Sequence, residues 1–152
     1  MAERHGRPAE GALEPGEAIL ALATCQPPGA IENQTFRAVR VVVTDRRFLV
    51  LKTSALTGRS KGDVELEIPL RDITSVETRK RRSIATIGLP IFTVGLSLAD
   101  GRAIVLESSG IAIKKHRNLA EVLQSTAQSV EGSQYHPRTE SAGRERSGQR
   151  DP

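Results

Sequence analysis

Apolar and polar side chains alternate along most of this chain, and that period of two is the strongest constraint on its fold. The run DVELEIPL at residues 63–70 is the clearest case, because every second residue from Val64 to Leu70 is apolar. Successive side chains of a β-strand point to opposite faces, so the pattern predicts a half-buried strand. Similar runs predict strands at residues 17–25, 36–43, 47–52, 63–70, 73–78, 92–98 and 102–108.

Turn residues separate these predicted strands. Asp100-Gly101 lies between two of them and is a strong hairpin signal, and Asp45-Arg46 makes another tight connection. Pro69 falls on the outward register of its strand, which indicates a sheet edge or a strand end. About seven short strands at regular spacing favour a small sandwich or barrel.

The apolar period changes after the last predicted strand. Leu119, Val122, Leu123, Ala127 and Val130 are spaced as on one face of an amphipathic helix. The predicted order is therefore about seven strands followed by one C-terminal helix, which is a mainly β fold.

Both ends of the chain lack an apolar pattern. Residues 1–16 and 131–152 are rich in Gly, Pro and charged side chains, so we predict a flexible N-terminal segment and a disordered C-terminal tail. A single folded domain is predicted at 17–130. Cys25 is the only cysteine, which favours a reducing compartment. We see no secretory signal or spanning segment, and expect a cytoplasmic protein, soluble or peripheral to a membrane.

Four short stretches of the chain follow one another in a characteristic order: LEPGEAIL, VVVTDRRFLVL, IPLRDITSVE and VGLSLADGRAIVLES, followed by the helix. Together they resemble the bacterial pleckstrin-homology-like (PH-like) family, which is similar to the GRAM and PH superfamily, over about residues 13–127. The resemblance implies a barrel of about seven antiparallel strands capped by one C-terminal helix, and a binding scaffold more than a chemistry. Eukaryotic PH domains often bind phosphoinositides through basic residues between their first two strands. Here that loop, QPPGAIENQ, contains no Lys or Arg, so this site does not carry over.

The cations instead gather in a predicted loop at Arg79, Lys80, Arg81 and Arg82. The chain has a net charge of +4, and a basic cluster of this kind attracts anionic surfaces. Apolar residues follow it and would add insertion into a bilayer: Ile84, Ile87, Leu89, Ile91 and Phe92. The alternative is a solvated loop that leads into a core strand.

A second basic cluster, Lys114, Lys115 and Arg117, lies in the first turns of the predicted helix. Cations there oppose the helix dipole, which hints at a functional use. Plain solvation is the alternative. We take Arg79, Lys80, Arg81, Arg82, Lys114 and Lys115 as the candidate anion- or lipid-binding residues.

Other chemistries find little support in the sequence. There is no metal-ligand spacing, phosphate loop or nucleophile–base pairing, so we predict no catalysis, metal or cofactor. His116 stands alone near the helix start, where burial or capping is the expected role. Phe36, Phe48 and Phe92 all look like core residues, which argues against stacking on nucleic acid. No small-molecule substrate is implied.

Two functions are compatible with these patterns. The first is a non-catalytic PH-like module for protein–protein interaction or self-association, because antiparallel sheets leave pairable edges. The alternative is a peripheral binder of anionic membrane lipid through residues 79–82.

Overall fold

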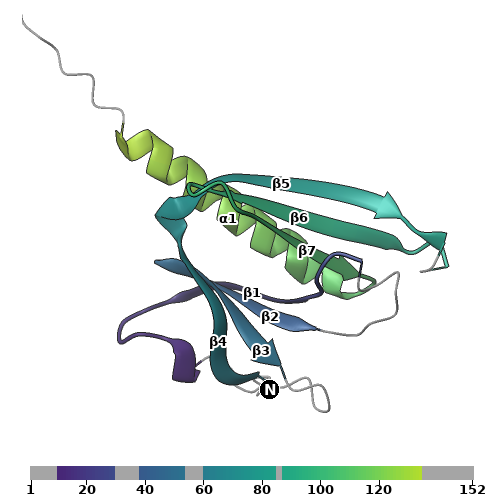
Figure 1. Cartoon of the computed structure of the whole chain (residues 1–152), viewed down its shortest axis with the longest axis horizontal. Coiled ribbons are helices and arrows are strands. Elements are labelled where there is room, and N and C mark those ends of the chain that lie inside the picture. Colours follow the sequence, from purple (N-terminus) through teal and green to yellow (C-terminus); the bar gives the residue numbers. More distant parts are fainter. Residues whose placement is uncertain (1–9, 30–37, 54–59, 85–86, 135–152) are drawn as a thin grey trace, which may run out of the picture.

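The computed structural model describes residues 10–29, 38–53, 60–84 and 87–134. Seven strands form two antiparallel sheets, of order β1-β2-β3-β4 and β5-β6-β7, and one long helix packs between them (Figure 1). The elements are η1 (Glu10–Ala12), β1 (Ile19–Cys25), β2 (Val39–Thr44), β3 (Arg47–Thr53), β4 (Ser60–Pro69), η2 (Leu70–Asp72), β5 (Ile73–Arg82), β6 (Pro90–Leu98), β7 (Ala103–Ser109) and α1 (Ala112–Gln134). The prediction of a mainly β fold with seven antiparallel strands and one C-terminal helix is confirmed.

Local turn chemistry explains the hairpins. Gly101 has φ 85° between β6 and β7, a conformation that glycine adopts without strain, and the Asp100 carboxylate accepts a hydrogen bond from the Arg102 N–H at 3.0 Å. Between β2 and β3, the Thr44 hydroxyl accepts hydrogen bonds from the Arg46 and Arg47 N–H groups. Both turns lie at the positions that their turn residues predicted.

One backbone bridge joins the two sheets. The Gln26 N–H donates to the Glu107 carbonyl and the Glu107 N–H donates to the Gln26 carbonyl, both at 2.8 Å. Gln26 directly follows β1 and Glu107 lies in β7, so this bridge closes the structure on one side. On the other side α1 packs against β1 and β5.

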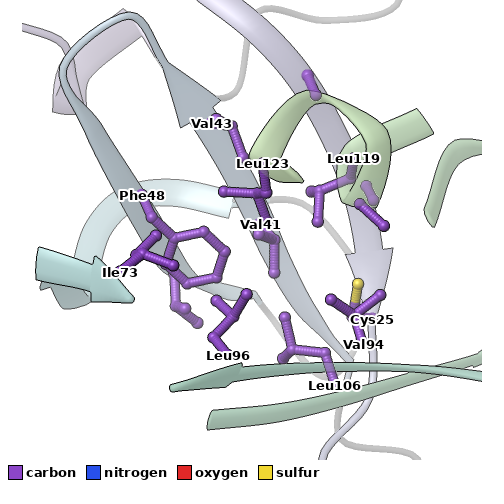
Figure 2. Packing of buried hydrophobic residues seen from close by; sticks show 14 of the residues in the cluster. Cys25, Val41, Val43, Phe48, Ile73, Val94, Leu96, Leu106, Leu119 and Leu123 are labelled. Atoms are coloured by element: carbon purple, nitrogen blue, oxygen red, sulfur yellow. The ribbon is translucent and has the colours of Figure 1, made fainter. Parts of the chain in front are cut away.

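The main core lies between the inward faces of both sheets and α1. Leu119 and Leu123 point from the helix toward Val41 of β2 and toward Val94 and Leu106 on the other sheet (Figure 2). These positions are the alternating strand residues and the helical stripe that the sequence predicted. Val122 is half-buried against this core, and His116 is a buried member of the same helix face that the apolar stripe did not include.

A smaller core lies on the opposite face of the first sheet. Val42, Leu49 and Leu51 are fully buried there, and Ala12 and Leu13 pack against them. Ala12 and Leu13 belong to the segment that we predicted as flexible, so the part of it from residue 10 packs on the sheet. Residues 1–9 and 135–152 lie outside the described residues.

One sequence prediction about local structure is wrong. Residues 79–82 are not a loop, because β5 runs on to Arg82 instead of ending at Thr78. Four further backbone pairs with β6, from Arg79 with Thr93 to Arg82 with Pro90, extend the ladder. The hydrogen bonds of this ladder outweigh the weak β-propensity of Arg and Lys.

Candidate functional site

The β5–β6 hairpin ends in an apolar tip. Ile84 is 98% exposed, Ile87 95% and Leu89 54%. The Ile87 N–H donates to the Ile84 carbonyl at 3.0 Å, and the Gly88 N–H donates to the Ser83 carbonyl at 3.2 Å. These bonds fold the tip so that isoleucines point to solvent, and we call Ile84, Ile87 and Leu89 the apolar tip.

The tip is hollowed beside a cation. Arg82, Ser83, Ile84, Ile87 and Gly88 line a depression of about 380 Å³. Two other apolar residues proposed for insertion do not belong to this surface, because Ile91 and Phe92 are buried. Of the five apolar residues proposed for insertion, only Ile84, Ile87 and Leu89 are therefore exposed for contact.

The strand geometry divides the four cations of residues 79–82 between two faces. Lys80 pairs with Phe92, whose ring is in the core, so Lys80 and Arg82 lie on the face that α1 covers. Arg79 and Arg81 lie on the outer face. The four cations therefore do not share one surface, and whether they bind an anion stays a prediction.

Arg81 also forms an ion pair, so its charge does not add to a basic surface patch. Its Nη2 lies 2.9 Å from Oε1 of Glu107, whose side chain is only 6% exposed. The other Glu107 oxygen accepts a hydrogen bond from the Gly29 N–H at 3.3 Å. Arg81 thus neutralises a buried carboxylate.

The helix cations also separate. Arg117 lies over the ring of Phe92, with 5.9 Å from its Cζ to the ring centroid, which is a cation–π geometry. Lys114 precedes it by three residues and shares its side of the helix. Lys115 lies about 100° around the helix from Lys114. From sequence we placed Arg117 in this cluster but not among the candidate binding residues.

His116 adds no charge to this surface. It is buried, and its Nδ1 lies 2.5 Å from the Ser108 hydroxyl. Burial lowers its pKa from 6.5 to about 4, so the ring is neutral at neutral pH. Its ring also meets Phe92 edge to face, with centroids 5.4 Å apart. The prediction of a buried histidine is confirmed, and its role is to pack the helix start on β6 and β7.

The apolar tip and the start of α1 lie at the same end of the molecule (Figure 1). Arg82 at the base of the tip pairs with Pro90, and the adjacent Ile91 pairs with Ser109 just before the helix. Ile111, in the turn that starts the helix, is fully exposed. The three most exposed large apolar side chains of the described residues, Ile84, Ile87 and Ile111, therefore share one end with Lys80, Arg82, Lys114 and Arg117.

An apolar groove opens elsewhere, between the two sheets. Val39, Val50 and Leu66 line one wall and Ile104 and Leu106 the other, and its volume is about 380 Å³. Only Glu65 among its lining residues is charged.

Three further observations concern thiol reactivity, metal binding and membrane spanning. Burial raises the pKa of the Cys25 thiol to about 12, so it stays protonated. Across the described ranges, no cluster of His, Cys, Asp or Glu is arranged to hold a metal ion. Within the same residues, α1 does not have the apolar run that a bilayer-crossing helix needs.

The comparison with protein families decides the identity of this fold. The sequence model of the family described as Bacterial PH domain matches residues 13–96, more than half of the chain. This chain belongs to the bacterial PH domain family. The match extends from before β1 to Leu96 in β6, so β7 and α1 of this PH domain lie beyond it.

A solved structure is similar as well. The crystal structure of a pleckstrin homology domain from Shewanella amazonensis SB2B shares 13% sequence identity, with a TM-score of 0.45, covering 76% of this chain and 88% of that one. Among curated proteins no match was found. PH-like domains commonly bind proteins or lipids and are generally non-catalytic, so the surface of this PH domain has to indicate which partner it binds.

Proposed function

We propose that this PH domain is a non-catalytic module that docks peripherally on anionic membranes through the tip of its β5–β6 hairpin. One observation carries the proposal: Ile84 and Ile87 are almost wholly exposed directly beside Arg82. Exposed apolar side chains next to cations match the boundary between acyl chains and anionic headgroups. This supports the membrane-binding alternative raised from the sequence, with the apolar tip as the main contact instead of a basic loop.

The expected energies fit reversible docking. Full burial of an isoleucine is worth about 1.5–3 kcal/mol, and each cation near an anionic leaflet adds about 1 kcal/mol. Two isoleucines and the cations Arg82, Lys80 and Arg117 would therefore reach several kcal/mol before the cost of immobilising the protein. We place this docking at a cytoplasmic leaflet, which carries negative surface potential and faces the reducing compartment that a lone cysteine favours.

Protein binding or self-association is the second candidate function. The apolar groove between the sheets favours it, because its walls would accept apolar side chains of an extended segment. The groove offers a single charge, that of Glu65, to select a partner, whereas the tip combines apolar and basic chemistry.

Vesicle flotation tests the proposal. The full chain should float with phosphatidylserine vesicles at low salt, less so at high salt, and not with neutral vesicles. The double substitution I84S/I87S should weaken binding by about tenfold or more. The control is Ile19→Ser on β1, which alters a 46% exposed isoleucine outside the tip and should leave binding unchanged.

Two results would overturn the membrane assignment. The first is an absence of flotation at low salt, and the second is equal binding by the wild-type chain and I84S/I87S. Light scattering on the same samples tests self-association. A dimer that persists in I84S/I87S would agree with the groove as its interface, whereas a dimer that I84S/I87S dissociates would assign the tip to self-association.

A further inference from the structure

We infer that the outer face of the second sheet binds the same face of a second copy of this chain. The inference goes beyond membrane docking, because it concerns a surface apart from the apolar tip. Glu77 and Arg79 of β5 carry it. A two-fold axis that crosses the strands between these two residues relates the copies, so each Glu77 faces Arg79 of the other copy.

The outer face of β5, β6 and β7 contains a shallow depression. Strand register places Glu77, Gly95 and Val105 in one row across the three strands, and Arg79 and Thr93 in the next row. These five residues line the depression, whose volume is about 270 Å³. The helix α1 packs on the inner face of this sheet and leaves the outer face uncovered.

Gly95 leaves the centre of the depression without a side chain. A glycine inside a strand weakens the strand, and it often marks a place where another backbone approaches closely. No contact among the described residues requires glycine here. Its φ is not positive, and an added Cβ would meet only the Glu77 carbonyl oxygen, at 4.0 Å. The missing side chain therefore leaves room for a second surface.

Glu77 and Arg79 are opposite charges exposed on this face. They point the same way from β5, about 7 Å apart along the strand. Across the described ranges no ion pair involves either of them, whereas Arg81, the next residue on that face, pairs with Glu107. A half-turn about an axis across the strands exchanges the positions of Glu77 and Arg79, so this charge pattern complements itself.

The same rotation also matches the shapes of the two faces. It places β5 over β5 and β6 over β6 of the other copy, with aligned strands as in sheets that pack face to face. Thr93 shares the row of Arg79, so it comes to lie over Gly95 of the other copy and enters the depression. The charges of Glu77 and Arg79 cancel within one face, so the face does not select an acidic or a basic partner. Its pattern fits a second copy.

Sedimentation velocity of the full chain over a range of concentrations tests the inference. We expect a dimer that weakens as the salt concentration rises, because salt screens exposed charges. E77R and R79E should each weaken the dimer about tenfold or more, because each places like charges opposite one another. The double substitution E77R/R79E reverses both charges and should restore the dimer.

Mixing the two single variants provides a second charge test. E77R carries a cation at both positions and R79E a carboxylate at both, so the mixture should form a heterodimer although each variant alone is monomeric. Lys115→Glu is the matched control, because it makes the same charge change as R79E at an exposed position of α1. It should leave the dimer unchanged. Circular dichroism of each variant shows that the fold is retained.

Gly95→Val separates dimer formation from the stability of the fold. The added side chain finds open space in the monomer, and valine suits a strand better than glycine. The variant should therefore unfold at a higher urea concentration than wild type. It should also fail to form the dimer, because the side chain fills the depression. A variant that is more stable and yet monomeric is not a misfolded one.

The outcomes of these measurements decide the inference. A wild-type chain that stays monomeric at every concentration rejects it. A dimer that E77R leaves intact, or that E77R/R79E does not restore, also rejects it and places the interface elsewhere, for example at the groove between the sheets. Membrane docking is tested separately. E77R/R79E keeps the net charge and the apolar tip, so it should float with phosphatidylserine vesicles as wild type does.

Discussion

Arg81 and Glu107 form an ion pair across strand β6, with 2.9 Å between Nη2 and Oε1. Arg81 lies in β5 and Glu107 in β7, and residues of β6 lie between them. The pair gives Arg81 a structural role, whereas Arg82, the next residue of the strand, faces the opposite side of the sheet.

We therefore predict that this ion pair does not contribute to membrane binding. The double substitution R81Q/E107Q keeps the net charge and should leave flotation with phosphatidylserine vesicles within about twofold of wild type. In contrast, R82Q should weaken it about fivefold, the effect of one cation near an anionic leaflet. R81Q alone should lower the free energy of unfolding by about 1–2 kcal/mol, because it leaves Glu107 without its charged partner. Urea unfolding checks the stability, and a loss of binding by R81Q/E107Q as large as that of R82Q would contradict the prediction.

A second prediction concerns strain at the apolar tip. Ile87 has φ 53°, a left-handed conformation that is unfavourable for a β-branched residue. Ile87→Asn should raise the free energy of unfolding by about 1 kcal/mol, because asparagine tolerates this conformation. The same change should weaken vesicle binding, since it removes an apolar side chain from the tip.

If Ile87→Asn raises the free energy of unfolding and weakens vesicle binding, the strained isoleucine serves membrane contact and not stability. Ile84→Asn serves as the control for the same change of side chain at a neighbouring tip position, where the positive φ is absent. It should weaken binding without raising stability. Equal stability changes in the two variants would rule out the proposed strain.

The third prediction concerns acid. Burial lowers the pKa of His116 from 6.5 to about 4, so the unfolded chain takes up this proton before the folded chain does. The free energy of unfolding should fall as the pH drops below 6.5, by about 3 kcal/mol once the pH is below 4. Urea unfolding at several pH values measures this slope.

His116→Asn provides the comparison for the acid effect. Asparagine keeps a polar atom near Ser108 but does not titrate in this range, so the slope between pH 6.5 and 4.5 should flatten. Glu17 does not interfere there, because its stabilising effect is lost only below pH 4.5. Hydrogen bonds from Arg47 lower the Glu17 pKa to about 2, and protonation removes them. An unchanged slope in the variant would contradict the assignment to His116.

A fourth prediction concerns the buried ion pair at the β2–β3 turn. The Glu17 side chain is fully buried, 2.7 Å from Arg47 Nη2, and it also accepts a hydrogen bond from the Thr44 hydroxyl at 2.6 Å. Glu17→Gln should lower the free energy of unfolding by about 3 kcal/mol, because Arg47 is also largely buried. The Glu67 carboxylate lies 2.9 Å from Nη1 of Arg47, but its side chain is half-exposed. It therefore compensates only in part for the lost charge of Glu17.

Glu14→Gln is the matched control for Glu17→Gln. Glu14 lies 3.7 Å from Arg47, but its side chain is 56% exposed, so its loss should cost less than about 1 kcal/mol. Thermal or urea unfolding of both variants measures the difference. Equal destabilisation by Glu17→Gln and Glu14→Gln would contradict the prediction that burial decides how much each ion pair contributes to stability.

Local patterns in the chain were enough to establish the architecture and the family. Alternation marked the seven strands, Asp100-Gly101 marked a hairpin, and the 3.6-residue period marked α1. These signals are local, because each depends only on side chains within a few positions of one another. The order of four short stretches was enough to indicate the PH-like family, which the family match then confirmed.

Which cations act together depends instead on long-range pairing and packing. The extension of β5 to Arg82 requires backbone hydrogen bonds to β6, and this pairing then places Lys80 and Arg82 on one face and Arg79 and Arg81 on the other. The partner of Arg81 is 26 positions away, and Arg117 meets Phe92 only because α1 packs on the second sheet. Likewise, Ile91 is buried and Ile87 is exposed, although both belong to one apolar run of the sequence. Such contacts arise between segments that are distant in the chain, and a local pattern does not contain them.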